Sequence, residues 1–271
     1  MDTEPLKDWI GRSETVRDHL TGSLIDRYRA TLDPYLWSDV PVPLGLHWCL
    51  GLAATPMGEL SEDGHTKRGA FLPPVPLPSR MWAGGEVVHH HALALNAPVT
   101  RTSTISDITA KQGKSGDLVF VTVSSEFHSG DKLCISERQD IVFRELSTLG
   151  AASAKPAAQN AGTRHDTLVP DPVMLFRFSA LTFNSHRIHY DQQYARDVEG
   201  YPDLVVHGPL QATVLLNLAA KIAGRSPHRF AFRGVAPVTL GAAIEIRHDQ
   251  DSVWCQNADG IKSFVAHYSD E

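Results

Sequence analysis

The densest group of side chains that can do chemistry lies between Thr182 and Asp191. This segment holds an asparagine, two histidines, an arginine, a tyrosine and an aspartate directly after a run of apolar residues. An imidazole titrates near neutral pH, so His189 can act as a general base, and the Asn184 amide can orient the water or substrate that loses the proton. We expect a functional loop here, because polar clusters on loops often carry function. The alternative is a loop whose polar groups only satisfy turn amides and carbonyls.

A second candidate group, His207-Gly208-Pro209, stands directly before a strongly apolar segment. Glycine lets a backbone approach a ligand closely, and the first N–H groups of a helix point outward without partners. For a thioester substrate, such amides would stabilise the enolate that forms when water adds to a conjugated double bond. The alternative is that His207 caps the helix and Gly208 only turns the chain.

The elements that must position these groups repeat the order of a helix followed by a sheet. In the first half, apolar residues at helical spacing predict a helix within residues 16–32, ended by Asp33-Pro34. In the second half, an aromatic-rich segment over 175–183 precedes a helix from Pro209 to Ala223. Antiparallel strands are expected near residues 87–88, 92–95, 99–108, 118–123 and 133–142, and again near 229–235, 242–248, 252–257 and 262–267.

The stretch from Ser147 to Gln159 is rich in Ala, Ser and Gly, which indicates a linker. We therefore expect an N-terminal half over residues 1–146, a linker over 147–166 and a C-terminal half over 167–271. The helix at 209–223 has almost no polar face, which predicts a sheet wrapped around it. This is the hot-dog arrangement, and the expected fold class is α+β, a double hot-dog. The first half has no equally apolar helix and has a proline-rich loop at 72–78, so we expect it to be opened for a long ligand.

Composition excludes several classes of function. The chain of 271 residues is 42% hydrophobic, has a formal net charge of −6 and contains no apolar run long enough to span a bilayer. No basic run with interleaved aromatics indicates nucleic acid binding, and residues 1–10 resemble no signal or transit peptide, so the cytoplasm is the expected compartment. The cysteines, Cys49, Cys134 and Cys255, are too scattered to predict disulfides or a zinc site. The run His89-His90-His91 alternates across a strand, so at most His89 and His91 could share an ion, and no metal is expected. No glycine pattern for nucleotide binding is present, and no other cofactor is expected.

The segment from Asn184 to Asp191, with Leu181-Thr182-Phe183 before it and His207-Gly208-Pro209-Leu210 after it, resembles the catalytic stretch of MaoC-like hydratases and dehydratases. Further segments resemble the branch of that family with mesaconyl-C4-CoA hydratase, itaconyl-CoA hydratase and the mitochondrial 3-hydroxyacyl-thioester dehydratase. They are Trp9-Ile10-Gly11-Arg12, Pro43-Leu44-Gly45-Leu46-His47-Trp48, Arg68-Gly69-Ala70-Phe71-Leu72-Pro73-Pro74 and Arg80-Met81-Trp82-Ala83-Gly84-Gly85.

The resemblance implies reversible hydration of an α,β-unsaturated acyl-CoA on a double hot-dog whose C-terminal half keeps the catalytic loop. The N-terminal half then helps to shape the acyl pocket. The family usually has Asp at the position of Asn184, and an amide cannot accept a proton. His189 is therefore the expected acid and base, with Asn184 holding the water or the imidazole and the amides around Gly208 stabilising the enolate. Asp191 taking the role of the missing Asp is the alternative.

Two arginines are candidates for reading a carboxylate at the far end of a short dicarboxylic acyl group. Arg187 stands where the wider family often has Pro, and its guanidinium can pair bidentately with a carboxylate. An ion pair with Asp191 or Glu199 is the equal alternative. Arg80 is the second candidate, for the carboxylate or a CoA phosphate. The expected substrate-binding residues are Arg187, Arg80, Trp82, Gly84, Gly85, His207, Pro209 and Asp191.

These expectations favour a hydro-lyase acting on a CoA thioester such as mesaconyl-C4-CoA or itaconyl-CoA. A dehydratase of fatty-acid synthesis acting on 3-hydroxyacyl thioesters is the nearest rival, a thioesterase is a more distant one, and a non-catalytic acyl-CoA-binding module is the rival from another class. A homodimer is left open, since two hot-dog halves in one chain can replace two single subunits.

Overall fold

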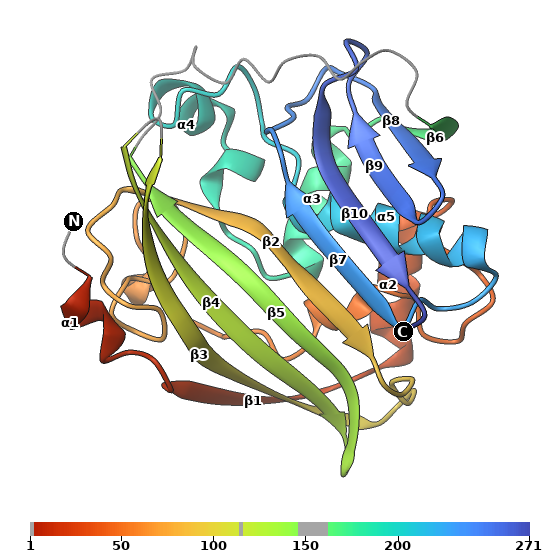
Figure 1. Ribbon diagram of the computed structural model, residues 1–271, viewed down its shortest axis with the longest axis horizontal. Helices are drawn as coiled ribbons and strands as arrows, with labels where there is room; N and C mark the ends of the chain where they lie inside the picture. The colour runs from red at the N-terminus through yellow and green to blue at the C-terminus, as the bar shows by residue number, and fades with distance from the viewer. Residues whose placement is uncertain (1–2, 114–115, 146–161) are drawn as a thin grey trace.

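One ten-stranded antiparallel sheet forms the body of the molecule (Figure 1). The computed structural model describes residues 3–113, 116–145 and 162–271. The strands run in the order β1-β3-β4-β5-β2-β7-β10-β9-β8-β6, so that five strands from the first part of the chain are followed by five from the second. The expected linker stretch, 147–159, lies outside the described residues. The last residues of the segment expected to be linker, from Thr163, belong to strand β6.

The strands of the first part are β1 (Ser13–His19), β2 (Ser79–His89), β3 (Pro98–Gly113), β4 (Gly116–Ser129) and β5 (Lys132–Arg144). Those of the second part are β6 (Thr163–Leu168), β7 (Arg229–Gly234), β8 (Ile244–Asp249), β9 (Ser252–Gln256) and β10 (Lys262–Ser269). The α-helices are α1 (Glu4–Lys7), α2 (Gly22–Leu32), α3 (Pro172–Leu181), α4 (Gln192–Asp197) and α5 (Gly208–Ala223). Short 3-10 helices are η1 (Leu46–Cys49), η2 (Met57–Glu59) and η3 (Arg187–His189).

Helix α5 is the buried helix that its apolar residues predict. Pro209 occupies its first turn, where a missing N–H costs nothing, and Gly224 ends it in the left-handed conformation. All residues from Leu210 to Ala220 are buried, and the helix packs against β7, β9 and β10. Burial on every side explains why the helix lacks a polar face.

The two parts of the sheet meet where β2 pairs with β7, from Gly84 opposite Arg233 to Val88 opposite Arg229. A Cβ atom on Gly85 would lie 2.1 Å from the backbone oxygen of Arg138 in β5, and one on Gly84 would lie 2.6 Å from the backbone oxygen of Phe232 in β7. Both glycines are buried. Their lack of a side chain lets β2 fit between its two neighbours. Strand packing therefore explains the presence of these two glycines, which we expected to bind substrate.

Two expectations about the first part of the chain were wrong. Residues 16–19 belong to the edge strand β1, and the helix begins only at Gly22, after Thr21 accepts a hydrogen bond from the Leu24 amide. The apolar residue at position 16 follows strand alternation, not helical spacing. Residues 92–95 form no strand, because the chain turns through Asn96 in the left-handed conformation at φ 56° before β3 begins. Trp82 to Gly85, expected to follow the proline-rich loop, are part of β2.

No helix in the described ranges is long and apolar enough to cross a bilayer. The aromatic-rich segment at 175–183 lies mainly in α3, which leads directly into the candidate catalytic loop.

Candidate active site

The candidate catalytic loop is held by local hydrogen bonds at both of its ends. Phe183, at φ 48°, turns the chain out of α3, and Asn184 Oδ1 accepts a hydrogen bond of 3.0 Å from the His186 amide. At the other end, Asp191 caps α4 by accepting from the Tyr194 amide at 3.0 Å. The loop therefore has a fixed shape that presents η3 to the interior. The structure shows Asn184 as a turn acceptor, and its role in orienting water or an imidazole stays a prediction.

His189 is the best-placed base in this loop. Its side chain is 7% exposed, and Nδ1 lies 2.8 Å from the backbone oxygen of Val205. A carbonyl can only accept, so Nδ1 carries the hydrogen and Nε2 keeps a free lone pair. Burial, with a smaller contribution from the charge of His65, lowers the pKa of His189 to about 4. The imidazole is therefore neutral and ready to accept a proton at neutral pH.

His207 lies flat against this base. The two ring centroids of His189 and His207 are 3.6 Å apart and the planes differ by 18°. His207 is fully buried, its Nε2 lies 2.8 Å from Ser179 Oγ, and its Nδ1 has no hydrogen-bond partner among the described residues. The residue occupies the N-cap position of α5, but its side chain makes no capping hydrogen bond. The stack therefore brings the N-terminus of α5 next to His189.

Gly208 begins α5 in a narrow space. A Cβ atom there would lie 3.1 Å from Trp82 Cε3 and 3.5 Å from Phe264 Cε2. The Trp82 ring also packs against Trp48 and Phe232, so it forms part of an aromatic wall at the helix start. The first amides of a helix have no intrahelical acceptor and carry partial positive charge, which suits a developing oxyanion.

Arg187 is engaged with its own loop. Its Nε and Nη2 donate to Asp191 Oδ2 at 3.1 and 2.7 Å, Nη1 donates to the Glu62 backbone oxygen at 3.1 Å, and the guanidinium lies 4.1 Å from the centroid of the Tyr194 ring. The structure therefore shows the ion-pair alternative for Arg187. The same contacts, together with the cap of α4, occupy the Asp191 carboxylate.

Arg80 has a different environment. Burial lowers the pKa of Arg80 to about 10, with the charge of Asp63 opposing this effect. Its guanidinium has no hydrogen bond or ion pair to another residue in the part of the chain that the structure describes. A partly buried guanidinium without a protein partner is suited to bind an anionic group of a ligand.

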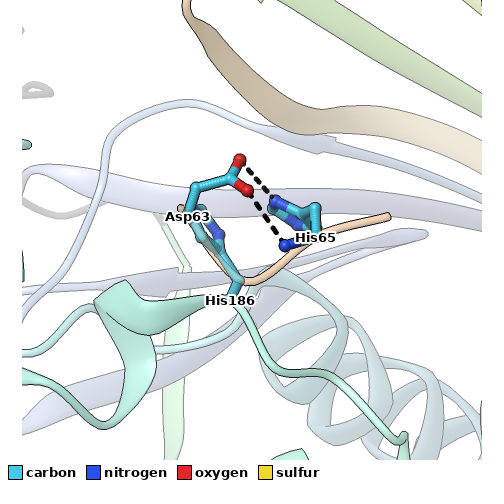
Figure 2. A group of neighbouring side chains, drawn as sticks. All are labelled: Asp63, His65 and His186. Carbon is cyan, nitrogen blue, oxygen red and sulfur yellow. Dashed lines mark hydrogen bonds and ion pairs between the residues drawn. The ribbon is translucent and has the colours of Figure 1, made fainter. Parts of the chain in front are cut away.

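The sequence did not identify two residues from the first part of the chain that lie beside the catalytic loop. Figure 2 shows Asp63 and His65, from the loop after η2, gathered with His186 from the catalytic loop. The His65 ring lies 4.1 Å from the His186 ring, centroid to centroid, and the His186 ring lies 5.5 Å from that of His189. The one sequence signal was an acid and a histidine around a glycine in a loop, Asp63-Gly64-His65, close to a segment that already resembled the family.

These three side chains are of types that bind metals, and their donor atoms lie within 4.8 Å of one another. Two features disfavour a divalent cation there. The Asp63 carboxylate already accepts from His65, and the guanidinium of Arg80 is close enough to act on the charges of Asp63 and His65. We therefore interpret the group as hydrogen-bonded imidazoles around one carboxylate. The rings of His89, His90 and His91 each contact a different partner: the Pro227 oxygen, Ser136 Oγ and the Leu133 oxygen.

A pocket of about 480 Å³ opens between α2 and α3, with two arginines among its lining residues. It does not include His189, although its wall reaches Leu181, the last residue of α3 before the catalytic loop. Its lining residues are Leu24, Arg27, Ala30, Thr31, Phe176, Arg177, Ala180 and Leu181.

Comparison with known proteins gives consistent results. Residues 45–240 match the sequence profile of the family "Hydroxyacyl-thioester dehydratase type 2". The chain is 46% identical over 237 residues to mesaconyl-C(4)-CoA hydratase of Chloroflexus aurantiacus, a match that covers 85% of this chain and 84% of that protein.

Solved structures agree on the fold. HtdX of Mycobacterium tuberculosis superposes with a TM-score of 0.68 at 17% identity, over 95% of this chain and 99% of that one. A conserved hypothetical protein of the same organism, described as having a double hotdog fold, superposes with a TM-score of 0.53 at 13% identity, over 96% and 95% of the two chains. The expected double hot-dog is confirmed.

Proposed function

The chain belongs to the hydroxyacyl-thioester dehydratase type 2 family and is a hydro-lyase of the acyl-CoA hydratase kind, and from this we propose that it hydrates a short dicarboxylic acyl-CoA of the mesaconyl-C4 type. The observation that carries the proposal is His189, a buried neutral imidazole with a free Nε2 beside the N-terminus of α5. The 46% identity to a mesaconyl-C(4)-CoA hydratase supports the acyl group.

In the proposed reaction, Nε2 of His189 takes a proton from water as the oxygen bonds to the β-carbon. The electrons of the double bond move onto the thioester oxygen, which becomes an enolate. The first amides of α5, around Gly208, stabilise this negative charge. The imidazolium then returns the proton to the α-carbon, so the enzyme ends the cycle unchanged and no other reactant is needed. The reverse sequence is dehydration.

We assign the recognition of the distal carboxylate to Arg80 and not to Arg187. The donors of Arg187 already bind Asp191 and the Glu62 backbone, whereas the partly buried Arg80 has no hydrogen-bonding partner among the described residues. The N-terminal half, which holds Arg80 and Trp82 on β2, would in this way shape the acyl pocket. His207 and Pro209 would act from the other side, by placing the α5 amides.

A hydration assay on mesaconyl-C4-CoA, itaconyl-CoA and crotonyl-CoA, with identification of each product, tests this proposal. We expect a higher kcat/KM for the dicarboxylic thioesters than for crotonyl-CoA. Preference for crotonyl-CoA or for longer 3-hydroxyacyl thioesters in the dehydration direction would favour the fatty-acid dehydratase, which the family name also supports. If the protein turns over none of these thioesters, the proposed substrate class is overturned.

Two finer points of the proposal concern the setting of the enzyme. We place it in the cytoplasm, where CoA thioesters are available, and allow a homodimer. Fractionation of the cells that make it and light scattering of the purified chain test these two points separately.

A further inference from the structure

The loop that carries Asp63 and His65 is bound tightly to the catalytic loop, although more than a hundred residues separate them in the sequence. The Arg187 amide donates to the Asp63 backbone oxygen at 2.9 Å, and Ser185 Oγ donates to the Gly64 backbone oxygen. Gly64, at φ +88°, packs so closely that a Cβ atom would lie 1.8 Å from the Ser185 oxygen. The two loops therefore hold one shape, and the side chains between them are positioned by the backbone.

Within this contact, Asp63 fixes the ring of His65. One carboxylate oxygen accepts from the His65 backbone amide at 2.9 Å and the other lies 2.9 Å from Nδ1 of the same residue. Burial alone would raise the pKa of Asp63, but the hydrogen bonds and charge of His65 and the charge of Arg80 outweigh it and lower that pKa. An ionised carboxylate can only accept, so Nδ1 of His65 carries a hydrogen and its Nε2 points away from Asp63.

The ring of His65 contacts His186, whose ring in turn contacts the base His189. His186, 8% exposed, lies between His65 and His189, and its ring nitrogens have no hydrogen-bond partner in the described part of the chain. Asp191 is held by Arg187, and Asn184 carries no charge. Asp63 is the carboxylate whose charge acts on His186. The charge of Arg80 acts on His186 in the opposite sense. Among the described residues, Asp63 is therefore the anionic neighbour of these imidazoles, and it comes from the other half of the fold.

When His189 takes a proton from water, it becomes a cation in a buried site, and burial penalises that charge. A carboxylate that is already ionised and fixed in place lowers the penalty without having to reorganise during the reaction. We propose that Asp63 supplies to the imidazole cluster the negative charge that Asn184 cannot supply, and that His65 is a positioning residue that holds this carboxylate in place through its two hydrogen bonds. This proposal rests on the proposed hydration, since it concerns the same step, and it assigns the missing carboxylate to the N-terminal half of the fold.

Replacing Asp63 by Asn tests the proposed role of the Asp63 charge, because the amide keeps the shape of the side chain and the backbone contacts while removing the charge. We expect Asp63→Asn and His65→Ala to lower kcat for mesaconyl-C4-CoA by about 100-fold with KM within about threefold of the native value, in line with the loss of general acid–base assistance. Asp63→Glu, which retains a carboxylate, should recover part of the rate. Since the pair acts as a unit, the double variant should be no slower than the slower single variant.

Glu62→Gln is the matched control, because this neighbouring carboxylate is exposed and its side chain makes no hydrogen bond or ion pair with a described residue. It should retain native kinetics. A kcat within threefold of native for Asp63→Asn would overturn the proposal, as would a rate loss in Glu62→Gln of equal size. Thermal unfolding and circular dichroism of each variant separate a rate loss from a loss of fold.

A measurement without substrate separates this proposal from the proposed function. In ¹⁵N-edited NMR of the free protein, His65 should show a hydrogen on Nδ1, and Asp63→Asn should shift the ring signals of His186 and His189 while Glu62→Gln leaves them in place. Unchanged signals in Asp63→Asn would overturn the proposal even if the native protein hydrates mesaconyl-C4-CoA. Shifted signals in a protein that hydrates none of the thioesters would overturn the proposed function and leave the electrostatic link standing.

Discussion

The backbone carbonyl of Val205 accepts a hydrogen bond of 2.8 Å from Nδ1 of His189, and the Val205 amide donates to the oxygen of Ile188, the residue before that histidine. One residue therefore fixes both the position of the base and its tautomer. Because both contacts use the backbone of Val205, no substitution other than proline removes a donor or acceptor at that position. The chemistry has to be tested at His189 itself.

Replacing His189 by Gln removes the base while leaving an amide of similar size. We expect kcat for hydration to fall by about 10²–10⁴-fold, the usual contribution of a general acid–base group, with little change in KM. Steady-state kinetics of the purified variant check this. Turnover within tenfold of native, with an intact fold by circular dichroism, would exclude His189 as the base.

The same histidine should make stability depend on pH. The pKa of His189 is about 4 in the folded chain and near 6.5 when unfolded, so between these values the unfolded state binds more protons. Its contribution to stability is fully present above about pH 6.5 and is lost as pH falls toward 4. Urea unfolding at several pH values should show a smaller loss over this window for His189→Gln than for the native chain. Equal pH dependence in the two proteins would contradict the lowered pKa.

Arg80 and Arg187 should separate in their effect on substrate choice. Removing the guanidinium in Arg80→Met should lower kcat/KM for mesaconyl-C4-CoA by about 10- to 150-fold, the range expected when a charge-assisted hydrogen bond worth about 1.5–3 kcal/mol is lost. The same change should affect crotonyl-CoA much less, since that acyl group has no distal carboxylate. Arg187→Met is the comparison, and it should lower kcat/KM equally for the two substrates. An equal loss for both substrates in Arg80→Met would remove Arg80 from carboxylate recognition.

Gly208→Ala should test the narrow start of α5. The new methyl group would lie 3.1 Å from Trp82 Cε3, so either the ring or the helix start must shift by a few tenths of an ångström. Because an oxyanion site depends on the placement of its donors, we expect kcat to fall by about tenfold or more while the melting temperature changes little. Gly224→Ala is a matched control at the other end of the helix; strain at φ 67° should lower its stability without this loss of kcat. Native kcat in Gly208→Ala would show that these amides are not part of the site.

Much of the local structure followed from the sequence because it depends on local patterns. The continuous apolar run after Gly208 predicts a helix buried on all sides, and α5 has that form. Strand alternation placed β5 and β7 to β10 to within about two residues, whereas β3 and β4 continue well beyond the expected ends at 108 and 123. The polar loop at Asn184 to Asp191 and its resemblance to a family were likewise visible in a single stretch of chain. The start of α2 was missed, because a short edge strand and a helix follow each other with apolar residues that fit either spacing.

What the tertiary structure decided is which distant groups meet. Nothing in the spacing of the chain places Asp63 and His65 beside His186, because that contact joins two loops from opposite halves of the sheet. From the sequence, Arg187 could bind either a substrate carboxylate or a neighbouring acid, and only the folded loop shows that its guanidinium donates to Asp191. The tautomer of His189 also depends on a carbonyl sixteen residues away. Local periodicity fixes elements and their buried faces, whereas the electrostatics of a site depend on distances between elements, and these exist only once the chain has folded.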